Sequence, residues 1–197
     1  MKLAIVKYNA GNIQSVTNAL ERLGFSAEIT DDPDAIRSAD KVIFPGVGEA
    51  SSAMKSLRQN RLDQVIRELK QPVLGICVGM QLLCAHSEEN DTPCIGIIPV
   101  SVKKFRSQDQ VLKVPQVGWN TIYGLQSPLF QGIEENSYIY NVHSYYAEDS
   151  DFTLANCHYG IEYAAAVGKD NFYGVQFHTE KSAATGDRIL KNFIERI

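Results

Sequence analysis

The chain has 197 residues, and its 19 basic and 23 acidic side chains give a net charge of −4. This length favours one domain or at most two small ones, and without a linker or internal repeat we expect a single domain over residues 1–197. The weak acidic balance gives no reason to expect nucleic acid or an anionic membrane as a partner. The apolar start ends at Lys7, too early for a signal peptide or a membrane-spanning helix, so we predict a cytoplasmic protein.

The four cysteines, Cys77, Cys84, Cys94 and Cys157, show neither C-x-x-C spacing nor paired histidine ligands. A zinc site is therefore not expected, and we predict no metal and no cofactor. Two disulfides would be possible in principle, but reduced thiols fit a chain without a secretion signal better.

In the first half of the chain, short apolar runs alternate with segments of helical periodicity. The runs predict strands at residues 3–6, 25–29, 41–44 and 73–76. Three segments predict helices. The first lies at 13–23 and ends at Gly24, the second is a short helix that begins at Asp31-Asp32-Pro33, and the third lies at 62–69. Strands that alternate with helices pair in parallel and carry helices on both faces. We therefore predict an α/β fold with a doubly wound, mostly parallel sheet.

The second half is richer in short β-type runs, at 97–102, 138–142 and 163–167, which Gly, Pro, Asn and Asp separate. These runs predict strands that extend or cover the sheet rather than further crossover units. Apolar positions from Ile189 to Ile197 predict an amphipathic helix at the end of the chain.

The segment Gly75-Ile76-Cys77-Val78-Gly79 lies where the strand at 73–76 must turn into a helix at 80–84. It is the cysteine form of the G-x-S-x-G nucleophile elbow. A nucleophile on so sharp a turn has a strained backbone, and the glycines leave room for it. The helix N-terminus favours the thiolate, and the Val78 amide can donate to an oxyanion. Because free cysteines are more often core residues, the elbow alone does not identify Cys77 as a nucleophile.

A possible base and acid follow 101 residues later, where a predicted strand ends in His178-Thr179-Glu180. Catalytic groups gather at the carboxyl ends of strands in a doubly wound sheet, so this segment is expected near Cys77. Side chains two apart on a strand point the same way, which lets Glu180 reach His178. A carboxylate on one ring nitrogen leaves the other free to take the thiol proton. We predict Cys77, His178 and Glu180 as catalytic residues, and expect His86 at a helix end and His158 in a loop, both without a catalytic role.

On these residues the chain resembles the class I glutamine amidotransferases, and within them the glutaminase subunits of imidazole glycerol phosphate synthase. Further matching segments are Gly11-Asn12-Ile13-Gln14-Ser15-Val16, Pro45-Gly46-Val47-Gly48 and Val114-Pro115-Gln116-Val117-Gly118-Trp119-Asn120. The resemblance extends nearly from end to end and implies hydrolysis of L-glutamine through a Cys77 thioester.

The resemblance also implies roles for other residues. The amides of Val47 and Val78 would form the oxyanion hole. The glutamine would be bound by Gly46, Gly48, Gln81, His143 and Ser144. Asn12, Trp119 and Lys181 would belong to the face that meets a synthase (cyclase) subunit, with which the chain would form a heterodimer. That subunit would use the ammonia to make imidazole glycerol phosphate and an aminoimidazole carboxamide ribonucleotide in histidine biosynthesis.

Two positions depart from the family pattern. The family usually has His-Pro-Glu where this chain has Thr179, and proline would stiffen that backbone. The first strand usually ends Asp-Tyr-Gly, and here Lys7-Tyr8-Asn9 follows it, which leaves open a paralogue that serves a different pathway. A valine in place of the second proline of Pro-Gly-Pro-Gly leads us to expect slow glutamine hydrolysis until the partner binds.

Three other functions remain to be separated from this one: a cysteine peptidase or a γ-glutamyl hydrolase of the same fold, and a binding module without catalysis. Gln81, the acid in His-x-Glu and the lack of an obvious peptide-binding region speak against the first two. Single residues have simpler explanations too: Gln81 as an exposed helix residue, Trp119 as a core residue and Lys181 as surface charge.

Overall fold

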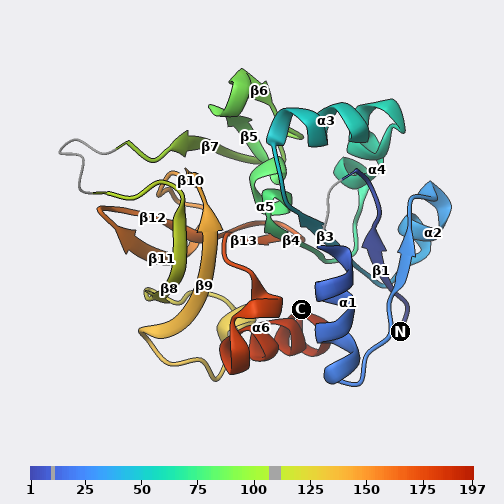
Figure 1. The fold of residues 1–197 in the computed structure, drawn as a ribbon. Coiled ribbons are helices and arrows are strands. Elements are labelled where there is room, and N and C mark those ends of the chain that lie inside the picture. Colours follow the sequence, from blue (N-terminus) through green and yellow to red (C-terminus); the bar gives the residue numbers. More distant parts are fainter. Residues whose placement is uncertain (10–11, 107–111) are drawn as a thin grey trace.

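The computed structural model describes residues 1–9, 12–106 and 112–197 (Figure 1). Ala10 and Gly11, part of the N-terminal segment that carries the resemblance, lie outside the described residues. Within them, eleven strands form one mixed sheet, and two more pair as a separate hairpin.

The first half is a regular alternation of strands and helices. Its elements are β1 (Leu3–Val6), α1 (Ile13–Arg22), β2 (Glu28–Thr30), α2 (Pro33–Ser38), β3 (Lys41–Gly46), α3 (Ala50–Gln59), α4 (Leu62–Glu68), β4 (Val73–Cys77) and α5 (Val78–Leu83). The strands predicted at 3–6, 41–44 and 73–76 are confirmed, as are the helices at 13–23 and 62–69. Gly24, with φ of 83°, has the left-handed conformation that ends α1.

Two predictions in this half need correction. The strand expected at 25–29 begins only at Glu28, where pairing with Ala4 of β1 starts; Phe25 and Ala27 pack against the core outside the sheet. Helix α3 is absent from the predicted elements, because two of its four buried positions are alanines, which weakens its apolar pattern.

Strands β2, β1, β3, β4 and β13 (Phe172–Val175) lie side by side in parallel. Helices α1 and α6 (Ala183–Arg196) cover one face of these strands, and α3 and α4 cover the other (Figure 1). Strand β4 is buried along its whole length, as a central strand between two helical layers must be. The doubly wound parallel arrangement is confirmed, and it places the end of β4 at the middle of the sheet.

As predicted, the second half extends the sheet with further strands, and most of these pair antiparallel. Its remaining elements are β5 (Cys84–Ser87), η1 (Glu89–Asp91), β6 (Thr92–Pro93), β7 (Ile98–Lys104), β8 (Gln116–Ile122), η2 (Pro128–Phe130), β9 (Ser137–His143), β10 (Tyr145–Ala147), β11 (Thr153–Tyr159), β12 (Ile161–Lys169) and η3 (Thr179–Lys181). The expected positions of two histidines were wrong: His86 pairs within β5 and His158 within β11. Both lie in strands whose character comes from pairing with partner strands rather than from the local sequence.

Strands β8 and β9 form the separate hairpin, in which Val117 pairs with Val142 and Trp119 with Tyr140. Its inward side chains, such as Ile139 and His143, are buried against the rest of the molecule. On its outer face Val117, Trp119 and Tyr138 are 59%, 54% and 64% exposed. Trp119 is therefore not a core residue.

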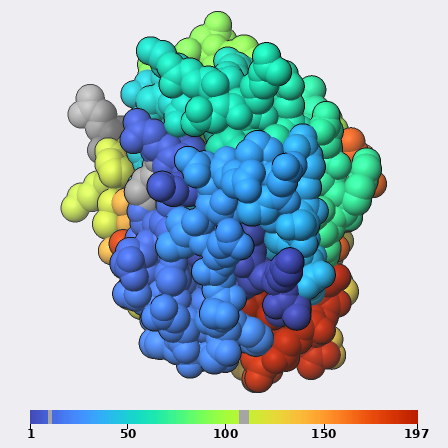
Figure 2. Space-filling model, turned by 90° about the vertical axis from the view of Figure 1, so that its right-hand side faces the viewer, coloured from blue at the N-terminus to red at the C-terminus, as the bar shows by residue number. Residues whose placement is uncertain are grey.

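The two ends of the chain pack together. In the space-filling view the C-terminal helix (red) lies against the N-terminal elements (blue) (Figure 2). Arg22 at the end of α1 pairs with Asp187 of α6 at 3.3 Å, and the Lys41 ammonium donates to the Phe193 carbonyl at 2.9 Å. None of the helices in the described residues combines the length and apolar character needed to cross a bilayer.

Candidate active site

Cys77 is the last residue of β4, and α5 begins at the next residue. Its backbone has φ 55° and ψ −114°, a strained conformation for a residue with a side chain. A Cβ atom at Gly79 would collide with the Phe44 carbonyl, and one at Gly75 would lie 2.8 Å from the Met80 nitrogen. The strained elbow predicted from the glycine spacing is therefore present.

His178 is fixed in place through its backbone. Its N–H donates to the Tyr140 carbonyl at 3.0 Å, and its own carbonyl accepts from the Ser182 hydroxyl at 2.6 Å. Both neighbours belong to elements that pack on the turn after β13. These bonds hold the histidine without the proline that usually follows it in the family.

Glu180 contacts His178 as expected, with 2.7 Å between the Glu180 Oε1 and His178 Nδ1 atoms. The geometry differs from the prediction: Glu180 lies in the η3 turn and not on a strand, because β13 ends at Val175. The tight turn, and not strand alternation, brings the two side chains onto the same side.

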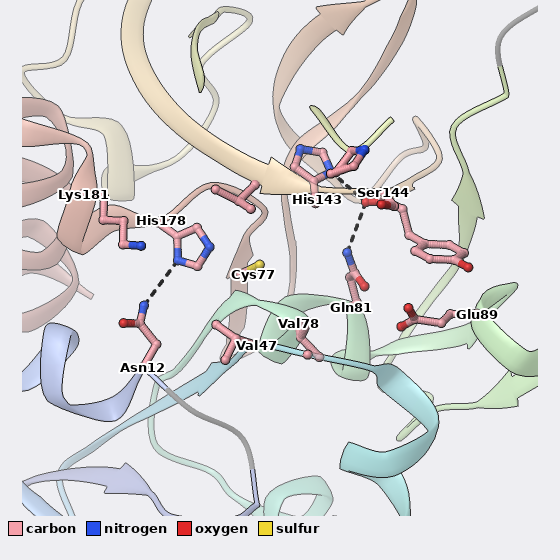
Figure 3. A pocket seen from close by; sticks show the side chains of 14 residues that line it. Asn12, Val47, Cys77, Val78, Gln81, Glu89, His143, Ser144, His178 and Lys181 are labelled. Carbon is pink, nitrogen blue, oxygen red and sulfur yellow. Dashed lines mark hydrogen bonds between the residues drawn. The ribbon is translucent and has the colours of Figure 1, made fainter. Parts of the chain in front are cut away.

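Asn12 also reaches this carboxylate. Its side-chain amide donates to the same Glu180 oxygen and lies 3.5 Å from the His178 Nδ1 atom (Figure 3). The Glu180 side chain is fully buried, and its Oε2 atom has no hydrogen-bond partner in the described part of the chain. Two donors on one oxygen thus define the position of the acid.

The electrostatic surroundings favour the protonated form of His178. Burial lowers its pKa. The hydrogen bonds to the Cys77 and Glu180 side chains, together with the negative charges of these two groups, outweigh burial and raise the pKa to about 10. Because Nδ1 faces Glu180, the other ring nitrogen is the one that serves Cys77. The arrangement supports a thiolate–imidazolium pair.

A pocket of about 560 Å³ opens over Cys77. It brings together most of the residues expected in the site: Asn12, Val47, Gly48, Cys77, Val78, Gln81, His143, Ser144, His178 and Lys181. Gly46 is not in the lining; it packs against Tyr8 and Gly79, where a side chain would not fit. Trp119 lies outside the pocket, on the exposed face of the hairpin.

Comparison with known sequences is decisive about the family. The model of the family "Glutamine amidotransferase class-I" matches residues 4–197. The chain belongs to the class I glutamine amidotransferase family.

Curated relatives carry the name "Imidazole glycerol phosphate synthase subunit HisH". The protein of that name from Bacteroides fragilis strain YCH46 is 53% identical over 195 residues, which cover 99% of this chain and 100% of the relative. The one from Haemophilus influenzae strain Rd is 45% identical, covering 100% of this chain and 98% of the relative.

Solved structures support the amidotransferase fold. A putative GMP synthase protein from Thermoplasma acidophilum has a TM-score of 0.74 at 21% identity, over 98% of this chain and 92% of that one. A crystal structure of a glutamine amidotransferase gives 0.76 at 18% identity, over 99% and 98%. At such identities the likeness concerns the fold alone.

His143 differs from His178 although both line the pocket of this amidotransferase. Its Nδ1 lies 2.7 Å from the Tyr145 carbonyl, so Nδ1 carries the proton, and its Nε2 faces the Tyr163 hydroxyl at 3.4 Å. Burial lowers the pKa of His143 to about 4, although the bond to Tyr145 acts in the opposite direction. His143 is therefore neutral at physiological pH.

Glu89 and Tyr8 contribute to the site, although the sequence led us to expect no role for either. Glu89 lines the pocket from η1, and its carboxylate accepts from the Ala50 amide at 2.7 Å. Burial raises the pKa of Glu89. The buried Tyr8 hydroxyl donates to the Pro45 carbonyl at 2.9 Å and so braces the loop that contains Val47. Both contacts join segments more than 35 residues apart, which no local pattern predicts.

Across the residues that the structure describes, no group of three or more His, Cys, Asp or Glu side chains is arranged to hold a metal ion. The chemistry that the pocket offers is that of its thiol, imidazole and carboxylate.

Proposed function

We propose that this chain is the glutaminase subunit of an imidazole glycerol phosphate synthase. It hydrolyses L-glutamine to glutamate and ammonia and passes the ammonia to a cyclase subunit. One observation carries the proposal: the strained Cys77 and His178 line the same pocket, and the His178 Nδ1 atom lies 2.7 Å from the Glu180 carboxylate.

In the first step the Cys77 thiolate attacks the carboxamide carbon of glutamine, and the electron pair of the carbonyl moves onto oxygen. His178 gives its proton to the amide nitrogen, the carbon–nitrogen bond breaks, and ammonia leaves. The product is a glutamyl thioester on Cys77 and a neutral His178.

Water completes the reaction. His178 takes a proton from water as the oxygen attacks the thioester carbon, and the carbon–sulfur bond then breaks to release glutamate and the Cys77 thiolate. Glu180 stays ionised throughout and holds His178 in the tautomer that both steps need. Asn12 supports Glu180 through the shared Oε1 atom.

Each step passes through an oxyanion, for which we propose the backbone amides of Val47 and Val78. Val78 directly follows the nucleophile, and both residues line the pocket with Cys77. Tyr8 anchors the loop at Pro45, whereas Gly48 has φ of 92° and open space where a side chain would lie. The permissive backbone at Gly48, next to Val47, fits an oxyanion hole that is completed only when the partner binds.

The other end of glutamine is zwitterionic, and the pocket offers acceptors for its ammonium group. Glu89 and Gln81 lie on the same side of Cys77, away from His178 and Lys181 (Figure 3). The Gln81 nitrogen donates to the Tyr145 and Gln176 oxygens, so its own oxygen remains for the ligand. We propose that Glu89 and the Gln81 oxygen bind the α-ammonium group, with His143 and Ser144 in the same wall.

The partner docks, in this proposal, on the outer face of the β8–β9 hairpin. Val117, Trp119 and Tyr138 form an exposed apolar patch there, and Trp119 packs edge-on against Tyr140 with 5.6 Å between ring centroids. Exposed apolar patches of this kind mark protein interfaces. Val142 belongs to both the hairpin and the pocket wall, so ammonia leaving Cys77 emerges beside the patch.

We infer the reaction that uses the ammonia from the name of the relatives, which are subunits of imidazole glycerol phosphate synthase. The cyclase subunit would use it to make imidazole glycerol phosphate and an aminoimidazole carboxamide ribonucleotide in histidine biosynthesis. The two chains would form a heterodimer.

Co-purification with a cyclase subunit, followed by glutamine turnover with and without that partner and its nucleotide ligand, tests the proposal. We expect a complex, slow turnover by the isolated chain and faster turnover in the liganded complex. Trp119→Ala should weaken the complex, whereas Ile29→Ala, at an exposed apolar side chain of the edge strand β2, should not. Full activity of the isolated chain, or no complex with the cyclase, would contradict the proposal.

A further inference from the structure

Gln176 is the first residue after β13, two positions before His178, and it is completely buried. Its backbone N–H donates to the Ala165 carbonyl at 2.8 Å, which fixes it against β12. Its side chain reaches the nucleophile: the Nε2 atom of Gln176 lies 3.8 Å from the Cys77 sulfur in hydrogen-bonding geometry. Neither the sequence motifs nor the mechanism above uses this residue.

The direction of the Gln176 amide is set by a chain of contacts that starts at the backbone. The Tyr145 carbonyl can only accept, so the atom of Gln81 that faces it at 3.1 Å must be the nitrogen. The same nitrogen lies 2.9 Å from the Gln176 side chain, which therefore presents its oxygen to Gln81. The Gln176 nitrogen is left to face Cys77.

An amide nitrogen donates hydrogen bonds and does not accept them. His178 lies beside Cys77 in the same pocket (Figure 3), so two nitrogen-bearing side chains face one sulfur. A thiol has a single proton and is a weak acceptor, whereas a thiolate accepts from both donors, and hydrogen bonds to a charged group are about twice as strong as neutral ones. The geometry around the sulfur suits the thiolate.

We propose that Gln176 is a catalytic residue that donates a hydrogen bond to the Cys77 sulfur and holds it as the thiolate. Gln81 acts through Gln176 as a positioning residue, because it fixes which end of the amide faces the sulfur. The bond is made before attack, is weakened while the sulfur is part of the neutral thioester, and is made again when the thiolate leaves. Gln176 gains and loses no proton. This inference deepens the proposed function and rests on it.

The test measures the rate at which iodoacetamide alkylates Cys77 between pH 5 and 9, with the Cys77 peptide followed by mass spectrometry. Gln176→Met removes the donor at similar length, and Gln176→Glu puts an oxygen acceptor against the sulfur. We expect Gln176→Met to slow alkylation at pH 7 by about fivefold to tenfold, and Gln176→Glu by more. The pH of half-maximal alkylation should move upward by about one unit.

Gln81→Met and the double variant distinguish orientation from packing. If Gln81 acts only through Gln176, Gln81→Met slows alkylation by about threefold alone and adds nothing in the Gln176→Met background. Gln116→Met is the matched control, because Gln116 is also buried but accepts a hydrogen bond from the Tyr163 hydroxyl at 3.1 Å. That variant should leave Cys77 alkylation unchanged.

Folded Gln176→Met and Gln176→Glu variants that are alkylated at the wild-type rate and pH midpoint would overturn the proposal. So would additive effects of Gln81→Met and Gln176→Met, because independent contributions exclude the orienting role. The proposed function can fail separately. If the wild type and the variants are alkylated at the expected rates but the wild-type complex does not turn over glutamine, the proposed function is refuted and the contact between Gln176 and the Cys77 thiolate still holds.

Discussion

The turn after β13 and the junction of β9 and β10 each place a buried histidine in the same pocket, and the two histidines have opposite properties. His178 faces a thiol and a carboxylate, and its pKa rises to about 10. His143 faces a backbone carbonyl and a phenol, and its pKa falls to about 4. Both are buried, so burial does not explain the difference. Charged partners decide which histidine holds a proton and which serves as a neutral part of the wall.

The largest effect is expected from removing the charge that supports His178. Glu180→Gln keeps the shape but can present its amide nitrogen to His178, which favours the wrong tautomer. We expect kcat for glutamine hydrolysis in the complex to fall by about 10³- to 10⁴-fold with little change in KM. Glu195→Gln, on the surface of α6, is the control. A Glu180→Gln enzyme within tenfold of wild type would show that the acid does not orient the base.

Replacing the nucleophile should change the histidine that it touches. After burial, the hydrogen bond to Cys77 is the largest influence on His178, and it raises the pKa. Cys77→Ser replaces the thiolate by a neutral hydroxyl, so we expect the pKa of His178 to drop from about 10 by about one unit or more. NMR titration of the imidazole signals measures this. His143 should be unaffected, and an unchanged His178 would argue against the thiolate–imidazolium pair.

Acid should destabilise the protein through His143. Its folded pKa of about 4 lies below the ordinary value near 6.5, so the unfolded chain binds the proton first as the pH falls. Between pH 7 and pH 5 the unfolding free energy should lose about 2 kcal/mol from this group. His178 has a raised pKa, so its contribution is complete only below about pH 6.5 and is lost progressively as the pH rises from there toward about 10.

Urea unfolding of wild type and His143→Gln at both pH values measures the His143 contribution. The variant should lose about 2 kcal/mol less than wild type on acidification. Equal losses in the two proteins would place the acid sensitivity elsewhere.

The smallest effect concerns Thr179, which lies between His178 and Glu180. Its hydroxyl is buried without a partner among the described residues, and His178 has the extended backbone that can precede proline. We expect Thr179→Pro to raise the unfolding free energy by about 0.5–1 kcal/mol, because it restricts the unfolded chain. Removal of the unpaired hydroxyl would be a second cause of such a gain. Thr179→Val removes the hydroxyl without adding a ring, so it separates this cause from the restriction of the unfolded chain. A destabilised Thr179→Pro protein with disturbed His178 signals would show that threonine is required there.

The sequence predicts the parallel half of the fold better than the β-rich half, for a physical reason. Strands β1, β3 and β4 are buried on both faces and appear as unbroken apolar runs, whereas β5 and β11 take their strand character from distant partners. The site shows the same difference between features that the local sequence contains and features that depend on distant segments. The elbow at Cys77 is a local pattern that the sequence contains in full.

Contacts between distant segments could not be predicted in this way. Asn12 meets Glu180 across 168 positions, Gln176 meets Cys77 across 99, and Tyr8 meets Pro45 across 37. Asn12 is expected at the partner face, and the structure adds a contact with Glu180, the proposed catalytic acid. Each of these contacts depends on the sheet order, which follows from the fold and not from any short segment.

The most direct test of the account is to trap the covalent intermediate. The complex is quenched with acid during glutamine turnover, and its peptides are analysed by mass spectrometry. The account predicts a glutamyl thioester on Cys77 that is absent from the Cys77→Ala variant, which should release no ammonia. Continued ammonia release by that variant, or an adduct on Cys84, Cys94 or Cys157 instead, would contradict it.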